Sequence, residues 1–426
     1  RFTFMQSLYN SLINFSQPVI SIAGKFSPKL KEFSEGRKDL FPRLEKLLQP
    51  GSHYIWIHAA SLGEFEMAVP VLKMLKNEYP SEKIIVSFFS PSGFNNKKKH
   101  ELVDIFTYLP LDTKYNAEKF LELINPKMAF FIKYDFWPNF LMGLKDRNIP
   151  TYLVSGVFRQ NQSFFKFYGK WMINSLQAFD HFFVQNEESA ELLSKIGFEN
   201  TTVAGDTRFD RVAAQITQDN RIEFIEDFKA NQLLTVFGSS WPEDENLFID
   251  YINKHPEQKF LIAPHEIKAE KIQTLSDKIK QPVLQFSEMK KANIEDFNVF
   301  ILDTIGYLGR VYSYADIAYI GGGAGSTGLH NILEPATFGI PIIIGSNYDK
   351  FPEAARLRQL AGLFSVKNSE EFEEIMDKFI SNPDFRKKSG MIAGHFINSN
   401  TGATRILESH LRVAENGGLT NIAKKK

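Results

Sequence analysis

Cysteine is absent from the 426-residue sequence. Its absence excludes disulfide bonds, thiolate metal sites and a cysteine nucleophile, and it is compatible with a reducing compartment. Net charge is absent too, because 50 lysines and arginines are matched by 50 aspartates and glutamates. The totals therefore indicate no general surface for polyanions, and nucleic acid is not expected as a partner.

Several familiar catalytic motifs are also missing. The sequence contains no Gly-x-x-x-x-Gly-Lys-[Ser/Thr] loop, no His-Glu-x-x-His, and no Gly-x-Ser-x-Gly at the end of a strand pattern. The nine histidines show no ligand spacing, and His53 and His58 lie five residues apart across an expected strand. We therefore expect neither a metal site nor a bound cofactor.

The first fifty residues differ in composition from the rest. No charged residue occurs in 2–24, and basic residues follow at Lys25, Lys29, Lys31, Arg37, Lys38, Arg43 and Lys46. Apolar residues recur at helical spacing at Phe4, Leu8, Leu12, Phe15 and Val19. The intervening polar residues and Pro18 make this a weak spanning segment, so we predict an interfacial, membrane-associated helix. The alternative is a helix that packs on the protein's own domain.

Two α/β domains are predicted from residue 54 onward. The chain is too long for one ordinary core, and short apolar runs alternate with longer amphipathic ones, as in a doubly wound parallel sheet covered by helices. In the first half, strands are predicted at 54–60, 83–90, 104–109, 128–133, 151–157, 181–185 and 202–205. In the second half, they are predicted at 233–237, 259–263, 299–303, 317–320, 340–344 and 363–366.

The stretch 208–231 is charged and lacks a strand pattern, which predicts a domain boundary. We expect an N-terminal membrane-associated segment (1–50), a Rossmann-like domain (51–210), a linker (211–231), a second Rossmann-like domain with C-terminal helices (232–414), and a tail (415–426). In open α/β sheets, ligands bind beyond the carboxyl ends of the strands. Functional residues should therefore follow strands, at a central cleft that the two domains face.

Glu64 ends the first loop of interest, 58–64, which leads from a strand into a helix. Gly63 lets the backbone turn tightly there, and the amides of a helix start can hold a polar or anionic group. Glu64 is then a candidate catalytic carboxylate. It is equally an ordinary acidic residue matched to the helix dipole.

Two loops of the second half carry hydroxyl or imidazole groups. Ser239 and Ser240 follow a strand and suit a phosphate or a sugar, although Ser240 also suits a helix N-cap. Pro264 and His265 follow the next strand, and the imidazole could reach a phosphate. A lone histidine is more often structural, so this loop alone indicates little.

The stretch 319–336 is the most distinctive, because a strand pattern runs into a glycine-rich turn. Backbone amides near Gly322 and Gly323 could approach a phosphate closely. Glu334, three residues past Asn331, could accept both hydroxyls of a ribose. A literal G-x-G-x-x-G begins at Gly323 and suggests a dinucleotide-dependent oxidoreductase as an alternative, but no acidic residue ends the next strand.

Together these loops resemble the transferases of 3-deoxy-D-manno-octulosonic acid (Kdo), glycosyltransferase family 30. These are inverting enzymes of the GT-B fold that use CMP-Kdo in lipopolysaccharide synthesis. The run 56–64 is similar to the family's W-x-H-A-x-S-x-G-E, and 331–336 matches its nucleotide-side signature N-x-L-E-P-A. The run 204–210 looks like G-N-x-K-F-D with Arg208 in place of lysine, and 264–266 resembles P-R-H without its arginine.

Two motifs depart from the family pattern and suggest a divergent subgroup. Lys133 begins the run Lys-Tyr-Asp-Phe-Trp-Pro where the family has E-T-E-x-W-P, so that a cation replaces one acidic group. The run 155–158 stands where the family has N-A-R-L, with Val157 at the arginine position and Arg159 close behind. These departures bear on how the acceptor or the Kdo carboxylate is bound.

The resemblance implies transfer of Kdo from CMP-Kdo to the lipid A precursor (lipid IVA), at the cytoplasmic face of the inner membrane, without a cofactor. It implies Glu64 as the catalytic base. The acceptor side would comprise Ser61, Gly63, Lys133, Asp135 and Arg208, and the CMP side Ser239, Ser240, Pro264, His265, Gly322, Gly323, Asn331 and Glu334. The alternatives are a GT-B enzyme using a UDP- or GDP-sugar, the oxidoreductase, or a membrane-bound binding protein without turnover.

Overall fold

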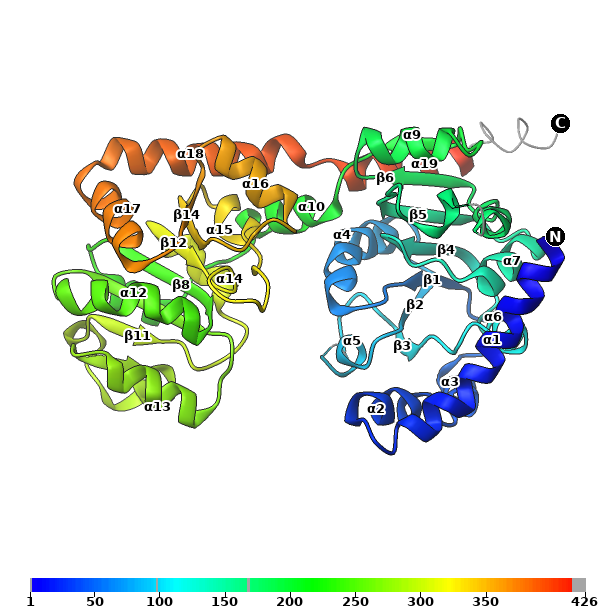
Figure 1. Cartoon of the computed structure of the whole chain (residues 1–426), viewed down its shortest axis with the longest axis horizontal. Helices are drawn as coiled ribbons and strands as arrows, with labels where there is room; N and C mark the ends of the chain where they lie inside the picture. Colours follow the sequence, from blue (N-terminus) through cyan, green and yellow to red (C-terminus); the bar gives the residue numbers. More distant parts are fainter. Residues whose placement is uncertain (1, 97–98, 167–168, 416–426) are drawn as a thin grey trace. The chain divides into compact units, whose positions relative to one another are not determined.

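The chain folds into two α/β units, and the computed structural model describes residues 2–96, 99–166 and 169–415 (Figure 1). The first unit runs from the N-terminus to Arg211 and resumes at Gly402, and the second is Val212–Thr401. Each contains a seven-stranded sheet in which all pairings are parallel. The prediction of two Rossmann-like domains, as in the GT-B fold, is confirmed.

The sheet of the first unit has the strand order β3-β2-β1-β4-β5-β6-β7. Its strands are β1 (Tyr54–His58), β2 (Lys83–Phe88), β3 (Ile105–Tyr108), β4 (Pro126–Ile132), β5 (Thr151–Gly156), β6 (His181–Val184) and β7 (Thr201–Val203). Every residue of β1 is buried, as expected for a parallel strand covered on both faces. Successive side chains of β1 enter different cores: Trp56 packs in one cluster and Ile55 and Ile57 in the other.

The sheet of the second unit has the order β10-β11-β9-β8-β12-β13-β14. Its strands are β8 (Leu234–Ser240), β9 (Lys259–Pro264), β10 (Val283–Gln285), β11 (Val299–Ile301), β12 (Ile317–Ile320), β13 (Ile342–Gly345) and β14 (Leu363–Val366). All the predicted strands are present in the two sheets, and β10 is an addition. Its three residues carry too short a pattern to be recognised in the sequence.

Helices connect the strands in both units. The first unit has α1 (Phe2–Ala23), α2 (Pro28–Arg37), α3 (Leu40–Leu47), α4 (Leu62–Glu78), α5 (Pro91–Asn96), α6 (Lys114–Ile124), α7 (Pro138–Asp146), α8 (Ile173–Leu176), α9 (Glu187–Ser194) and α19 (Ala403–Glu415); α10 (Thr207–Ala213) crosses the boundary. The second has α11 (Glu223–Lys229), α12 (Pro242–Lys254), α13 (Ala269–Lys278), α14 (Leu308–Val311), α15 (Leu333–Thr337), α16 (Pro352–Gln359), α17 (Ser369–Ser381) and α18 (Pro383–Asn400).

The predicted linker, 211–231, instead folds as part of the second unit from Val212 onward. It contains α11, in which Ile225 and Phe228 are completely buried. The backbone amide of Ile222 donates to the hydroxyl of Tyr314, and Lys229 pairs with Asp316 at 2.8 Å. The abundance of charged residues in this stretch hides the few apolar side chains that fix it to the core.

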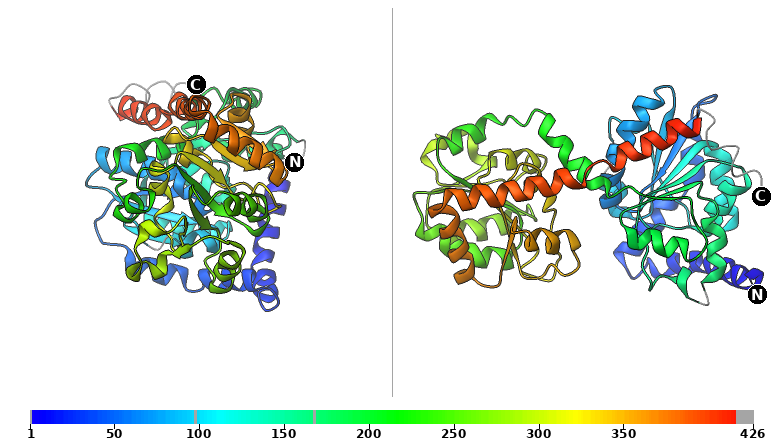
Figure 2. Two further views of the ribbon diagram at one scale, coloured as in Figure 1. Left: turned by 90° about the vertical axis from the view of Figure 1, so that its left-hand side faces the viewer. Right: turned by 90° about the horizontal axis from the view of Figure 1, so that it is seen from above.

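The last helix also differs from its predicted place in the second domain, because α19 packs on the first unit (Figure 2). Leu407 and Leu411 are buried in the core that contains Ile55 and Ile57. The sequence of an amphipathic helix does not state which sheet its apolar face covers. Of the predicted tail 415–426, the residues beyond Glu415 lie outside the described part of the chain.

The predicted N-terminal segment, 1–50, forms α1, α2 and α3, which belong to the first unit (Figure 1). Tyr9 and Asn10 of α1 face the protein: Tyr9 donates to Asp112 at 2.7 Å, and Asn10 accepts from Asn139 at 2.9 Å. Within the described residues, no helix combines the length and apolar character needed to span a bilayer.

Candidate functional site

The strand order of the first sheet reverses between β1 and β4. The chain proceeds from β1 outward to β2 and β3, then returns to β4 and proceeds the other way. Ligands of open α/β sheets bind at this reversal, beyond the carboxyl ends of the strands. His58 is in register with Phe131, so the loop that leads to Glu64 and the loop that begins at Lys133 are neighbours.

Glu64 lies in the first turn of α4, whose N-cap residue is Ser61. The hydroxyl of Ser61 donates to Oε2 of Glu64 instead of capping a backbone amide. Among the described residues no group donates to the other carboxylate oxygen, Oε1. Glu64 is 8% exposed, so the residue is largely enclosed. One oxygen is thus held in place, while the other can accept a proton.

Gly63 is exposed in the same turn. A Cβ atom added there would meet only Oγ of Ser61, at 3.8 Å. Its backbone φ is not in the left-handed region that favours glycine. The fold of the chain therefore gives no steric reason for glycine, although glycine within a helix is unfavourable. Open space directly beside Glu64 is consistent with the approach of a substrate.

Asp135 is held by a buried chain of polar groups. Its Oδ2 lies 2.6 Å from Nε2 of His58 and accepts from Nε1 of Trp137 at 3.0 Å. On the other side of the ring, Nδ1 of His58 lies 2.8 Å from Oγ of Ser87, which accepts from Nε1 of Trp56. A neutral His58 with its proton on Nε2 satisfies every group in this chain. Asp135 is therefore fixed in the loop next to Glu64.

Lys133 begins that loop in a strained backbone conformation, with φ of 72°. Hydrogen bonds on both sides hold it: its amide donates to the carbonyl of Val154, and its carbonyl accepts from Val157. A left-handed non-glycine residue costs about 1–2 kcal/mol, and such strain gathers at functional sites. Among the described residues, neither Lys133 nor the exposed Arg159 has a carboxylate partner. Both cations can therefore meet an anionic ligand.

Arg208 lies beyond the edge strand β7 and is engaged within the protein. Its Nε and one terminal nitrogen each lie 2.8 Å from Oδ2 of the buried Asp206. Thr207 ties the same loop to the site, because its hydroxyl donates to the carbonyl of Met67 in α4 at 2.7 Å. The structure thus connects the Arg208 loop with the helix that carries Glu64, with part of the charge of Arg208 already neutralised.

In the second unit the strand order reverses between β8 and β12, and Gly238 is in register with Ile320. The glycine-rich turn after β12 therefore lies beside Ser239 and Ser240 at the end of β8. Gly322 has φ of 90°, and a Cβ there would come within 2.0 Å of the carbonyl oxygen of Gly328. Only glycine fits this position.

A buried carboxylate, Asp244, organises the glycine-rich turn. It accepts hydrogen bonds from the amides of Gly322 and Ala324, from the hydroxyl of Tyr319 and from the amide of Trp241, at 2.8–3.2 Å. The amide of Gly322 is thus used inside the protein, whereas the sequence led us to expect it at a phosphate. Gly323, one residue further, is buried behind the same turn.

The two serines at the end of β8 differ in their surroundings. Ser240 is buried, and its hydroxyl lies 3.4 Å from Oε1 of Glu245, whose pKa is raised by burial. The helix N-cap is Trp241, so Ser240 does not cap the helix. Ser239 is half-buried and left-handed, with φ of 56°. Of the pair, Ser239 is the better placed to reach a ligand.

His265, which follows Pro264 at the end of β9, is stacked between two other rings. Its ring centroid lies 4.4 Å from that of Trp241 and 4.5 Å from that of His330. Nε1 of Trp241 donates to Nε2 of His330 at 3.1 Å. Burial lowers the pKa of His265 and lowers that of His330 to about 4. Both rings are therefore neutral near pH 7, so His265 can donate an N–H but contributes no positive charge.

Asn331 and Glu334 lie together beyond the glycine-rich turn. Nδ2 of exposed Asn331 donates to Oε1 of Glu334 at 3.2 Å, and Oδ1 of Asn331 accepts from the amide of Leu333. Asn331 is exposed and Glu334 is half-buried. Ser326 and Thr327, on the glycine-rich turn, are also exposed. This arrangement presents a carboxylate and an amide that can face ribose hydroxyls.

The comparisons with known proteins concern the chain as a whole and its two-domain fold. A family model described as 3-deoxy-D-manno-octulosonic-acid transferase (kdotransferase) matches residues 34–211, which include every predicted acceptor-side residue. A 3-deoxy-D-manno-octulosonic acid transferase of Haemophilus influenzae is 26% identical over 423 residues, covering 94% of this chain and 96% of that protein. The chain is thus similar to Kdo transferases over almost its whole length.

Solved structures share the two-domain fold of this chain. UDP-GlcNAc 2-epimerase from Neisseria meningitidis, bound to UDP-GlcNAc, aligns with a TM-score of 0.59 at 14% identity, over 84% of this chain and all of that one. MurG of Acinetobacter baumannii aligns with a TM-score of 0.53 at 11% identity, over 84% of this chain and 99% of that one. These identities are low, so the likeness concerns the two-domain fold alone.

The chain also carries three polar groups that the sequence motifs did not single out. Ser87 completes the buried chain behind Asp135, Asp244 fixes the glycine-rich turn, and His330 forms one side of the ring stack. Each acts through a contact between residues far apart in the sequence, so local spacing gives no sign of it. The sequence placed Asp244 at the start of α12, but it did not indicate that Asp244 binds the glycine-rich turn.

Proposed function

We propose that this protein transfers Kdo from CMP-Kdo to a hydroxyl of the lipid A precursor, releases CMP, and uses Glu64 as general base. The observation that supports the proposal most is the state of the Glu64 carboxylate at the β1–β4 reversal. Ser61 holds one of its oxygens, and no described residue occupies the other. The Kdo transferase relatives support the choice of sugar.

In the proposed reaction, the acceptor oxygen bonds to the anomeric carbon of Kdo while its proton passes to Oε1 of Glu64. The bond from that carbon to the CMP oxygen breaks, and its electron pair leaves with CMP. A single displacement inverts the anomeric carbon. A primary hydroxyl is a weak nucleophile, and removal of its proton as the bond forms contributes roughly 10²–10⁴ in rate.

Cations of the first unit suit the anionic groups of the substrates. Lys133 and Arg159 lack carboxylate partners among the described residues, and we assign them, together with Arg208, to the Kdo carboxylate or to the acceptor phosphates. Asp135, fixed by His58, would accept a hydrogen bond from a sugar hydroxyl.

On the second unit, CMP would be held by neutral donors. We assign the leaving phosphate to Ser239, to the N–H of His265 and to the exposed hydroxyls of Ser326 and Thr327. Glu334 and Asn331 would take the ribose. Ser240 and Gly322 then act by shaping the loops, since their polar groups are bound to Glu245 and Asp244.

The acylated acceptor resides in a membrane, and α1 provides a means of reaching it. We propose that the protein works at the cytoplasmic face of the inner membrane, with α1 lying in the interface. The support is the outward apolar face of the helix together with its basic flank.

Glu64→Gln tests the base. It preserves the side-chain shape but cannot accept the proton, so we expect kcat to fall roughly 10²–10⁴-fold while CMP still protects the protein in a thermal shift. Glu78→Gln, at the other end of the same helix, is the control and should retain activity. Glu64→Gln activity within tenfold of wild type would exclude the base role. Stronger protection by UDP or GDP than by CMP would exclude the proposed donor.

A further inference from the structure

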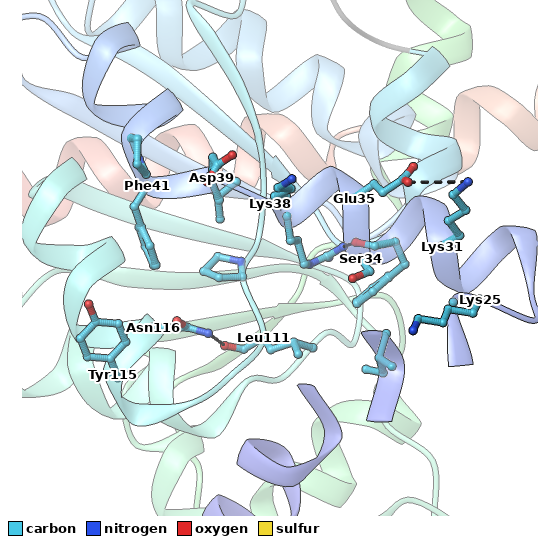
Figure 3. Close-up of a pocket in the computed structure, with 17 residues that line it drawn as sticks. Lys25, Lys31, Ser34, Glu35, Lys38, Asp39, Phe41, Leu111, Tyr115 and Asn116 are labelled. Atoms are coloured by element: carbon cyan, nitrogen blue, oxygen red, sulfur yellow. Dashed lines mark hydrogen bonds and ion pairs between the residues drawn. The ribbon is translucent and has the colours of Figure 1, made fainter. Parts of the chain in front are cut away.

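A cavity of about 890 Å³ lies in the first unit among α1, α2, α3 and the loop after β3 (Figure 3). Its walls come from residues 20–42 and 110–116, none of which belongs to the loops at the β1–β4 reversal. The lining is mixed: Ile20, Leu40 and Pro110 are apolar, and Ser34 and Asn116 are polar. The volume is in the range of sites for small molecules.

The charges that line this cavity are predominantly positive. Lys31 is paired with Glu35 at 3.8 Å, which leaves Lys25, Arg37 and Lys38 against the single carboxylate of Asp39. Within the described part of the chain, neither Lys25 nor Lys38 has an ion-pair partner, and Figure 3 shows Lys25 extending toward the cavity. An anion is therefore favoured inside it.

Arg37 adds a cation that no described carboxylate neutralises. Its guanidinium donates to the carbonyls of Phe33, Phe89 and Leu109 and lies 3.6 Å from the ring centroid of Phe33. Burial lowers the pKa of Arg37 to about 9, which still leaves it charged near pH 7. A charge kept in protein surroundings without a counter-ion attracts an anionic ligand.

Helix α1 exposes a row of apolar side chains and turns two polar side chains toward the protein. Tyr9 and Asn10 face the protein, whereas a row of apolar residues faces outward, with exposed fractions of 42–71%. The row consists of Phe4, Leu8, Leu12, Phe15, Val19 and Ile22. At 1.5 Å per residue it extends about 27 Å. An outward apolar row of this length marks a membrane or a partner surface, and the row ends beside Ile20, Gly24 and Lys25 of the cavity.

We propose that this cavity binds the phosphate head group of one anionic phospholipid from the bilayer on which α1 lies. The basic side chains suit the phosphate, the apolar lining suits the upper part of the acyl chains, and the outward row of α1 suits the surrounding leaflet. The row is longer than a ligand confined to the cavity, which favours a bilayer lipid. The proposal concerns lipid binding and does not depend on the transfer reaction.

Short-chain lipids that remain monomeric in water provide a direct test on the full-length protein. We expect dihexanoylphosphatidylglycerol to bind with one-to-one stoichiometry in calorimetry, at least tenfold more tightly than dihexanoylphosphatidylcholine. The double variant Lys25→Glu and Lys38→Glu should lose at least tenfold in affinity, because each basic residue contributes about fivefold near an anionic lipid. Ser34→Phe, which fills the cavity without altering its charge, should lose a similar amount.

The matched control is the double variant Lys73→Glu and Lys195→Glu, which changes charge equally at exposed lysines away from the cavity. It should bind like wild type, and all variants should keep the wild-type melting temperature and turn over a detergent-dispersed acceptor normally. Equal affinity for the two lipids, or unchanged affinity in either cavity variant, would overturn the proposal. So would inorganic phosphate binding as tightly as the lipid, or binding of the phosphorylated acceptor alone.

Discussion

At position 63 the fold gives no steric reason for a glycine. Gly63 occupies the first turn of α4, with open space where a side chain would be and only Oγ of Ser61 within 4 Å. Alanine favours a helix over glycine by up to about 1 kcal/mol. In the proposed function, glycine at this position leaves room for the substrate beside Glu64.

Gly63→Ala should raise the free energy of unfolding by up to about 1 kcal/mol and lower kcat/KM at least tenfold, because the new methyl group occupies the space beside Glu64. Urea unfolding and a steady-state assay measure the two effects. Gly309→Ala, in a helix of the second unit where nothing lies within 4 Å, is the control and should leave activity unchanged. Wild-type activity in Gly63→Ala would show that no substrate approaches this point.

Single residues of the candidate site could be predicted only where their role depends on local sequence. Glu64, Ser61 and Gly63 lie in one helix turn after a strand, and the structure has them there. The partner of Gly322 could not be predicted in the same way. Whether a loop amide faces a ligand or a buried carboxylate depends on Asp244, about 80 residues away, and spacing along the chain does not contain that information.

At the scale of secondary-structure elements, α1 is tied to the site through Asp112. This buried carboxylate accepts from the hydroxyl of Tyr9 and from the amides of Asn139 and Phe140, in the first turn of α7. The helix α7 directly follows the loop that contains Asp135. Helix α1 and the loop at the β1–β4 reversal are therefore connected through one anchoring group, Asp112.

Tyr9→Phe should lower the free energy of unfolding by an amount that depends on pH. Burial raises the pKa of Asp112 to about 6, from 3.8, and the bond from Tyr9 opposes that rise. A raised pKa means that the stability from this group is complete below about 4 and is lost as pH rises through about 6. Without the hydroxyl, burying the charged form costs more. We expect a destabilisation of about 1.5–3 kcal/mol near pH 7.5 and a smaller one near pH 5.

Urea unfolding of the variant and the wild type at both pH values measures that difference. Tyr115→Phe, at an exposed tyrosine of the same unit, should change stability at neither pH and is the control. An equal loss for Tyr9→Phe at both pH values would contradict the role of the Asp112 charge.

The sequence predicted some strands and helices more accurately than others. Strands such as β1 and β12 are continuous apolar runs, and their positions follow from the sequence. The helix α11 was missed because most of its residues are charged and only two in the helix are fully buried. The pattern of a short segment reveals its burial only when apolar residues dominate it.

At the scale of the whole molecule, α19 makes the first unit discontinuous in sequence. Its Leu407 and Leu411 are buried in the core of the first sheet, and Arg412 donates to both carboxylate oxygens of Glu78. His410 packs against His181 of β6 with the two rings tilted, and the ring centroids lie 4.2 Å apart. The last helix is therefore part of the first core.

Leu407→Ala should destabilise the first unit by about 2–5 kcal/mol, because it leaves a cavity in that core. The second unit should be unaffected, although α19 directly follows it in the chain. Hydrogen exchange read by mass spectrometry separates the two units. Val413→Ala, on the exposed side of the same helix, should change neither unit. Loss of protection confined to Val212–Thr401 would contradict the assignment of α19.

The return of the chain at Gly402 has a consequence for biosynthesis. The second unit is an insertion within the first, so the ribosome has produced all of Val212–Thr401 before the residues that complete the earlier core emerge. Domains usually fold in the order of their synthesis. Here the second unit can complete its folding while the first unit still lacks α19. This incomplete first unit is the folding intermediate that nascent-chain chaperones would meet.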